Sequence, residues 1–171
     1  PYCALILVMA HLSCASAAQT LEPVLNNDQV TYRWAKADDG GGLVAIVTAA
    51  QTSSLLNDKV QKPQWWRVKL KGGRTITNTQ LPCKVGKTSN GLVFTWTGDI
   101  RVTVKAHLDG AMLRSRIKVN TIKQGVGLRD VVFPVIDGIR PLSKDAADDR
   151  LLLARRTGHT APTPLTTGKP V

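Results

Sequence analysis

The 171-residue chain has few of the residues from which most catalytic sites are built. It contains three histidines, three cysteines and a single glutamate, Glu22. There is no Gly-x-Ser-x-Gly elbow, and Gly125-Val126-Gly127 lacks the third glycine of a dinucleotide-binding loop. His11 falls in the expected signal segment, and neither His107 nor His159 has a second His, Cys or carboxylate at ligand spacing. The sequence therefore predicts no catalytic residue, no cofactor and no metal site in this chain. Whether the chain is part of a larger enzyme stays open.

The remaining candidate ligands and acids are isolated. His107 falls on the polar face of an expected strand, and His159 falls in the C-terminal tail. Asp145, Asp148 and Asp149 cluster before an expected strand, where aspartates usually accept hydrogen bonds from nearby backbone amides. A calcium site at this cluster is the alternative, although the cluster lacks the pattern of a calcium-binding loop.

Helical periodicity is also scarce, and only short turns around residues 54–57 and 145–149 are expected. Short runs of β-type residues alternate instead with glycine- and asparagine-rich turns. The expected strands and hairpins are Val30 to Ala37 with Leu43 to Ala49, Gln64 to Leu70 with Thr75 to Gln80, Leu92 to Thr97, and Ile100 to Asn120. This pattern predicts an all-β fold, an antiparallel β-sandwich of the supersandwich type, over residues 24–156. Residues 157–171 are rich in Pro, Gly and Thr and are predicted to be a linker or the start of a missing downstream domain.

The clearest unit is the hairpin from Ile100 to Asn120. Apolar residues occupy every second position in both halves, and Asp109-Gly110 separates the halves. Glycine is expected there because a tight turn needs a positive φ. The hairpin is therefore predicted to have one apolar face and one solvated face, as in a sheet covered on one side.

Positive charge exceeds negative charge by a wide margin, with a formal net charge of +11. The cations alternate with apolar or small residues, as in Arg67, Lys69 and Lys71 or in Arg114, Arg116 and Lys118. We interpret this spacing as the solvent faces of half-buried strands. A nucleic-acid partner is not expected from such scattered charges, whereas an acidic polysaccharide is an alternative partner for a cationic face.

The first 18 residues are predicted to be a signal peptide. An uncharged apolar run covers residues 4–10, and Ala15-Ser16-Ala17 provides the small-x-small pattern of a cleavage site after Ala17 or Ala18. The run is short for a permanent membrane span, so a secreted or periplasmic protein is expected. A lipoprotein anchored through Cys14 is the minor alternative. Because an initiating Met and a basic leading region are missing, the sequence is expected to be a fragment.

Two further features concern side chains of the expected sandwich. If Trp65 and Trp66 lie in one strand, their side chains point to opposite faces, so one of them should be exposed or packed against another domain. Trp65 and Trp66 are accordingly the candidate carbohydrate-contact residues, because a flat aromatic ring stacks on sugars. After signal removal, Cys83 is the single cysteine, and it should be either buried or paired outside these residues.

Several phrases of the chain resemble the β-sandwich domains that precede (β/α)8 catalytic barrels. They include Pro63-Gln64-Trp65-Trp66-Arg67-Val68, Val131-Val132-Phe133-Pro134-Val135-Ile136 and Gly138-Ile139-Arg140-Pro141-Leu142. The chain is similar, over roughly residues 24–160, to the galactose-mutarotase-like front domain of exported, glycoside-hydrolase-like proteins. The resemblance implies that the catalytic carboxylates lie in a downstream barrel. A mutarotase-type site would need paired histidines and a glutamate in the sandwich, so that activity is not expected here.

The leading hypothesis is a non-catalytic module that supports a missing catalytic barrel and contacts carbohydrate. The alternative is a free-standing secreted protein, either a carbohydrate-binding module or a structural β-sandwich.

Overall fold

A computed structural model describes residues 22–57 and 59–140, and the backbone of residues 150–153 and 159–162. The strands of the main body are β1 (Val24–Asn26), β2 (Val30–Trp34), β3 (Leu43–Thr48), β4 (Arg67–Leu70), β5 (Thr75–Thr77), β6 (Cys83–Thr88), β7 (Gly91–Thr97), β8 (Ile100–Asp109), β9 (Met112–Thr121) and β10 (Leu128–Val132). Two single-turn 3-10 helices, η1 (Ala37–Asp39) and η2 (Asn78–Gln80), interrupt them. The predicted all-β class is confirmed.

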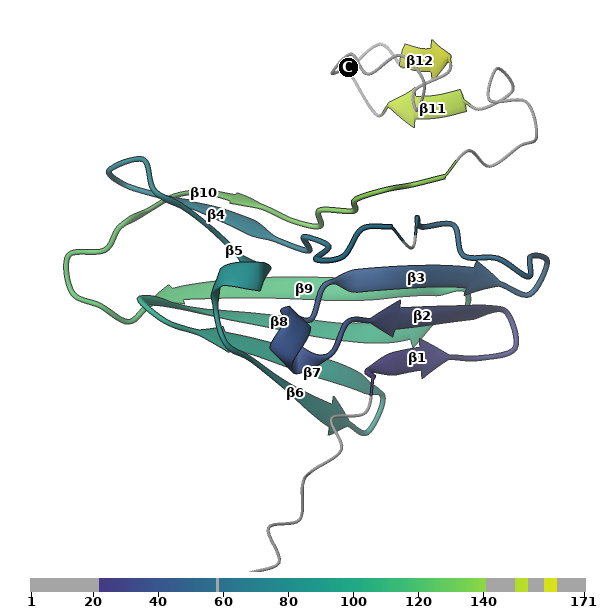
Figure 1. The fold of residues 1–171 in the computed structure, drawn as a ribbon, viewed down its shortest axis with the longest axis horizontal. Helices are drawn as coiled ribbons and strands as arrows, with labels where there is room; N and C mark the ends of the chain where they lie inside the picture. Colours follow the sequence, from purple (N-terminus) through teal and green to yellow (C-terminus); the bar gives the residue numbers. More distant parts are fainter. Residues whose placement is uncertain (1–21, 58, 141–149, 154–158, 163–171) are drawn as a thin grey trace, which may run out of the picture.

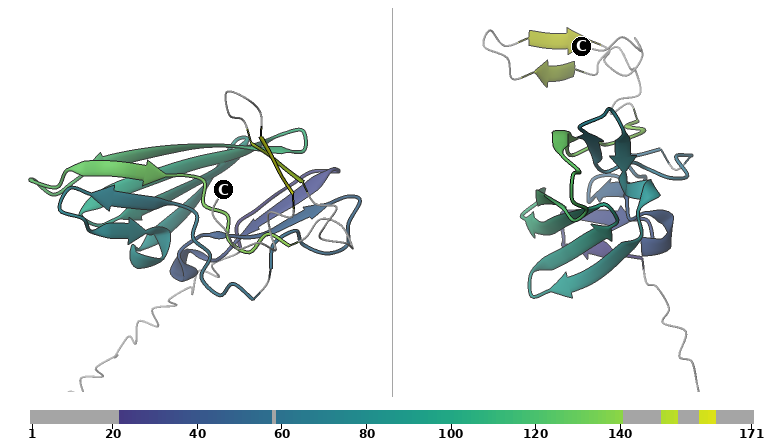
Figure 2. Two further views of the ribbon diagram at one scale, coloured as in Figure 1. Left: turned by 90° about the horizontal axis from the view of Figure 1, so that it is seen from above. Right: turned by 90° about the vertical axis from the view of Figure 1, so that its left-hand side faces the viewer.

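The strands of the main body form two layers. One layer is the sheet β6-β7-β8-β9, and the other consists of two three-stranded sheets, β1-β2-β3 and β10-β4-β5. The smaller sheets lie against one face of the larger sheet (Figures 1 and 2). All of these strand pairs are antiparallel, so the predicted antiparallel sandwich is confirmed.

The hairpin β8–β9 follows its predicted pattern closely. It pairs from Ile100 with Thr121 to Asp109 with Met112, and Gly110 turns the chain with a φ of 58°. The inward row of β8 is buried and holds Ile100, Val102, Val104 and Ala106. The outward row is exposed at Arg101, Lys105 and His107. Alternation therefore assigns every residue of this strand to the layer interface or to solvent.

The core between the layers is an aromatic cluster. Its five largest side chains are each at most 1% exposed: Trp34, Trp65, Trp66, Phe94 and Trp96. The ring centroids of Trp34 on β2 and Phe94 on β7 are 5.5 Å apart, and those of Trp66 and Trp96 are also 5.5 Å apart. These contacts connect β7 with β2 and with the chain that enters β4. A small set of aromatic residues therefore packs the three sheets together.

One expected turn of helix is absent at residues 54–57. The backbone is irregular there, and Leu56 forms an isolated bridge with Ile139. Leu56 is 2% exposed, and the Ser54 hydroxyl accepts hydrogen bonds from the amides of Ile46 and Leu56. The helical prediction is wrong because burial of Leu56 and these side-chain hydrogen bonds replace those of a helical turn.

The predicted segments near the two ends of the chain are described only in part. β11 (Arg150–Leu153) pairs with β12 (His159–Pro162) in a separate two-stranded sheet, and the expected boundary after residue 156 stays a prediction. The predicted signal peptide with Cys14, the cleavage site after Ala17 or Ala18, and the Asp145, Asp148 and Asp149 cluster lie outside the described residues.

Candidate functional site

Trp65 and Trp66, the predicted carbohydrate contacts, both lie in the core. The expectation that one ring is exposed or packed against another domain is wrong, because it assumed that strand alternation extends through both residues. β4 begins only at Arg67. The irregular backbone before it is held by hydrogen bonds from the Trp65 amide to Asn78 Oδ1, 2.8 Å, and from the Val135 amide to the Trp65 carbonyl, 2.9 Å. In this structure neither ring presents a face on which a sugar can stack.

Asn78 organises the loops beside these tryptophans. It is fully buried, and its Nδ2 donates to the carbonyls of Gly40 and Pro63, at 3.0 and 3.1 Å. The indole Nε1 of Trp96 donates to the same Gly40 carbonyl at 3.0 Å. Asn78 therefore connects η2, the loop after η1 and the chain entering β4. An asparagine in a short Asn-Thr-Gln stretch carries no sequence signal for this role.

The glycine triplet of residues 40–42 is required by the same packing. Gly40 has a φ of 89°, which side-chain-bearing residues rarely adopt. A Cβ at Gly42 would lie 2.0 Å from the Pro63 carbonyl oxygen. The glycines of this predicted hairpin connection thus allow the backbone to approach the core closely.

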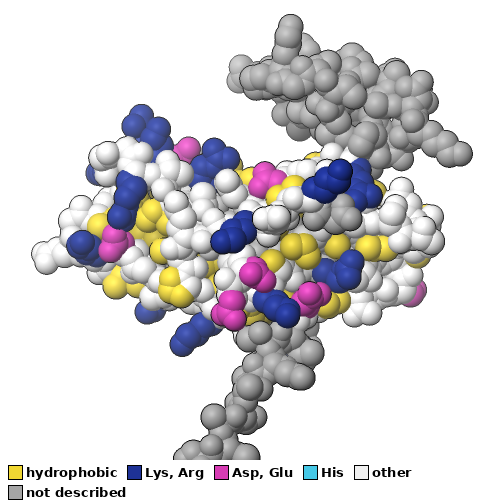
Figure 3. Space-filling view, in the orientation of Figure 1, with side chains coloured by type: hydrophobic (Ala, Val, Ile, Leu, Met, Phe, Trp, Pro, Cys, Tyr) yellow, Lys and Arg dark blue, Asp and Glu magenta, His cyan; other side chains and the backbone are white. Residues whose placement is uncertain are grey.

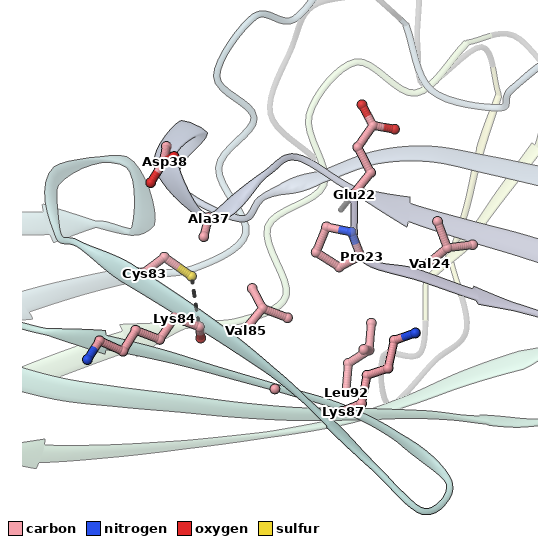
Figure 4. A pocket seen from close by; sticks show the side chains of 11 residues that line it. Glu22, Pro23, Val24, Ala37, Asp38, Cys83, Lys84, Val85, Lys87 and Leu92 are labelled. Atoms are coloured by element: carbon pink, nitrogen blue, oxygen red, sulfur yellow. Dashed lines mark hydrogen bonds between the residues drawn. The ribbon is translucent and has the colours of Figure 1, made fainter. Parts of the chain in front are cut away.

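A hollow of about 680 Å³ opens between the edges of the two layers. Cys83 and Val85 project from β6 toward Pro23, which precedes β1 (Figure 4). Acids and cations are also present on its lining, namely Glu22, Asp38, Lys84 and Lys87. Among the described residues no histidine lines this hollow, so none of them provides the Cys83 thiol with the neighbouring imidazole base that activates a cysteine nucleophile.

Cys83 itself is a half-buried free thiol. Burial raises its pKa to about 12. A thiol with so high a pKa is protonated near neutral pH, and the protonated form is a poor nucleophile and a poor metal ligand.

The outward face of the four-stranded sheet carries several basic side chains. We call this surface the cationic face; it holds Lys84 of β6, Arg101, Lys105 and His107 of β8, and Arg114, Arg116 and Lys118 of β9. All seven residues are exposed, as the alternation predicted. The other side of the molecule, where β1–β3 lie in front, instead mixes acidic and basic side chains (Figure 3).

Two ion pairs lie at the ends of this sheet. Arg114 contacts Asp109 at 2.9 Å, and Arg74, in the β4–β5 turn, contacts Asp99 in the β7–β8 turn. The hydrogen bond from Arg74 lowers the pKa of Asp99, and the positive charge of Lys123 acts in the same direction. Within the described residues, no carboxylate forms an ion pair with Arg101, Lys105, Arg116 or Lys118.

A second unusual surface is the apolar segment, residues 131–139. Its exposed side chains are Val131, Val132, Ile136 and Ile139, at 37%, 43%, 39% and 45% exposure. Its backbone is fixed nonetheless: the Val135 amide donates to Trp65, the Gly138 carbonyl accepts from the Asn57 amide at 2.7 Å, and Asp137 accepts from the Gln64 amide at 2.9 Å. The segment thus holds four partly exposed apolar side chains on a backbone fixed by hydrogen bonds, with Val131 and Val132 on opposite sides of β10.

The described ranges contain no cluster of three or more metal-ligating side chains. His107 lies among cations on the cationic face. The helices of the described part of the chain are single turns, and none could cross a membrane.

Comparison with known proteins found no match: no protein-family model, no curated protein and no solved structure is similar to this chain. The resemblance to the front domains of glycoside-hydrolase-like proteins therefore rests on its sequence phrases alone and stays a prediction.

Proposed function

We propose that this chain is a non-catalytic β-sandwich module of a secreted or periplasmic, glycoside-hydrolase-like protein, and that it docks onto a downstream domain of the same polypeptide. The observation that carries the proposal is the apolar segment. It places four exposed aliphatic side chains within nine positions, at the C-terminal end of the main body.

Such a segment favours an intramolecular partner. Water-exposed apolar side chains close together in the chain often mark an interaction surface. Because hydrogen bonds to residues 57, 64 and 65 already fix the backbone, a docking domain would have little chain entropy to remove on contact. The apolar segment is also one of the stretches that resemble the front domains of barrel-containing proteins, which supports a barrel as the partner.

The proposal is tested by side-chain labelling. The coding sequence should be followed downstream of Val171 and the longer product expressed beside the 171-residue chain. Hydroxyl-radical footprinting should then label Val132 and Ile136 in the short chain and leave them protected in the long one. Met112 and Ile122, which are 58% and 49% exposed on another part of the surface, are the internal controls and should be labelled in both.

A stop codon directly after Val171 would refute the proposal. Equal labelling of Val132 and Ile136 in the two proteins would refute it as well, because the downstream domain would then leave the segment uncovered.

A further inference from the structure

We propose that the cationic face binds an acidic polysaccharide, with Lys105 and Arg116 at the centre of the contact. This inference does not rest on the proposed docking role, because it concerns the outer surface of the four-stranded sheet and not the apolar segment.

The strand register arranges the cations in a regular grid. One row across the sheet is Lys84–Thr95–Thr103–Lys118, the next is Gly86–Val93–Lys105–Arg116, and the third is Thr88–Gly91–His107–Arg114. Along β9, the outward cations Arg114, Arg116 and Lys118 repeat at about 7 Å, twice the rise per residue of a strand. A linear polymer with repeated anionic groups can meet such a row at several points at once.

The arrangement places like charges opposite each other. Lys105 faces Arg116 across the β8–β9 pair. Directly opposed like charges destabilise a sheet, and solvated surfaces normally intersperse both signs. A bound anion between Lys105 and Arg116 would remove this repulsion.

The corresponding cations of β4 do not lie opposite other cations. Arg67 lies opposite Thr77 and Val132, and Lys69 lies between Thr75 and Asp130. The same period-two pattern in the sequence therefore has two different surroundings, and the directly opposed pair of cations, Lys105 and Arg116, is found on β8–β9.

The cationic face is also hollowed. A depression of about 350 Å³ is lined by Lys105, His107, Arg114, Ser115 and Arg116. It brings guanidinium groups, an ammonium group and an imidazole to one place, and guanidinium groups bind carboxylate or sulfate through paired hydrogen bonds. The hydroxyls of Thr95 and Thr103 in the adjoining row can accept or donate to sugar hydroxyls.

The same grid favours a polysaccharide over a nucleic acid. Sheets that bind single-stranded nucleic acids usually present aromatic rings on which bases stack. The outward rows hold no aromatic ring apart from the His107 imidazole, and the four tryptophans are buried in the core.

The test compares two variants of the 171-residue chain with equal loss of charge. K105Q/R116Q removes one Lys and one Arg from the centre of the cationic face, and R67Q/K69Q removes one of each from β4. Binding to polygalacturonate, dextran sulfate, neutral dextran and single- and double-stranded DNA is measured by affinity electrophoresis and calorimetry at matched salt. We expect the wild-type chain to bind one or both acidic polysaccharides but not neutral dextran. K105Q/R116Q should lose affinity by about tenfold or more, and R67Q/K69Q by less than about twofold.

Several results would overturn the proposal: no binding to either acidic polysaccharide, an equal loss in the two variants, or tighter binding to DNA than to the polysaccharides. Chemical-shift mapping of the wild-type chain with an oligogalacturonate or a sulfated oligosaccharide gives a readout independent of variant folding. Shifts should concentrate on β8 and β9, and shifts confined to β4 or to the edge hollow would contradict the assignment.

Discussion

At the scale of single residues, the buried side chain of Asn78 holds several loops of the core in place. One side chain satisfies three backbone groups in the core, the Trp65 amide and the carbonyls of Gly40 and Pro63. A buried polar group without a partner costs more than a hydrogen bond contributes when it forms. The loops around the tryptophans therefore depend on this amide.

Replacing Asn78 with Ala should lower the free energy of unfolding by about 2–4 kcal/mol, because the buried Trp65 amide loses its acceptor. Urea unfolding followed by tryptophan fluorescence measures the change. Asn120→Ala, on the exposed outer row of β9, is the matched control and should change stability by less than about 0.5 kcal/mol. Similar effects of the two substitutions would show that the buried contacts of Asn78 are not what stabilises these loops.

The raised pKa of Cys83 makes a prediction about alkaline pH. Between the ordinary thiol pKa of 9.0 and the folded value of about 12, the unfolded chain loses the thiol proton and the folded chain keeps it. The folded state then binds more protons, so the contribution of Cys83 to stability is present below pH 9.0 and declines as the pH rises toward 12. Comparing the free energy of unfolding of the wild type with that of Cys83→Ser across this pH range isolates that decline.

Alkylation provides the second measurement on Cys83. At mildly alkaline pH, iodoacetamide should modify the Cys83 peptide far more slowly in the native chain than in denaturant, as read by mass spectrometry. Equal rates in the two conditions would contradict the raised pKa.

At the scale of elements, the β4–β5 turn is fastened to the β7–β8 turn by Arg74 and Asp99. Removing the guanidinium in Arg74→Met should raise the pKa of Asp99 toward its ordinary value of 3.8, because the largest cause of its lowering is the Arg74 hydrogen bond. The stabilising effect of the pair is present above pH 3.8 and is lost as the pH falls through the lowered folded pKa. Carboxyl NMR titration of Asp99 measures the shift, with Arg129→Met on β10 as the control. An unchanged Asp99 titration in Arg74→Met would refute this cause.

Some of the elements could be predicted from the sequence alone, and others could not. The β8–β9 hairpin was predictable because period-two alternation and an Asp-Gly turn specify both its faces and its end. β6 was not expected, because Cys-Lys-Val-Gly-Lys-Thr has little apolar alternation and gains its order from pairing with β7. Trp65 was misplaced because its surroundings depend on Asn78 and Val135, which are distant in sequence. The grid of cations required the register, since Lys105 and Arg116 are neighbours only across the hairpin.

At the scale of the whole molecule, the aromatic cluster should make the sandwich unfold as one unit. Trp34 of β2 and Trp66, which directly precedes β4, both contact rings of β7. Tryptophan emission and far-ultraviolet circular dichroism should therefore give the same urea midpoint. Separated midpoints would show that one of the smaller sheets unfolds independently.

The edge of the larger sheet has a consequence for self-association. Lys87 lies opposite Leu92, whose side chain is buried. The side chain of Lys87 is therefore on the inward side of β6, which is an edge strand of the sheet. A second polypeptide adding to that strand would have to desolvate this charge, and natural sheets use inward charges of this kind to prevent intermolecular β-pairing. At high protein concentration we therefore expect little fibril growth from the free edge of β6. An apolar residue in place of Lys87 should allow a second polypeptide to pair with this edge and fibrils to grow from it.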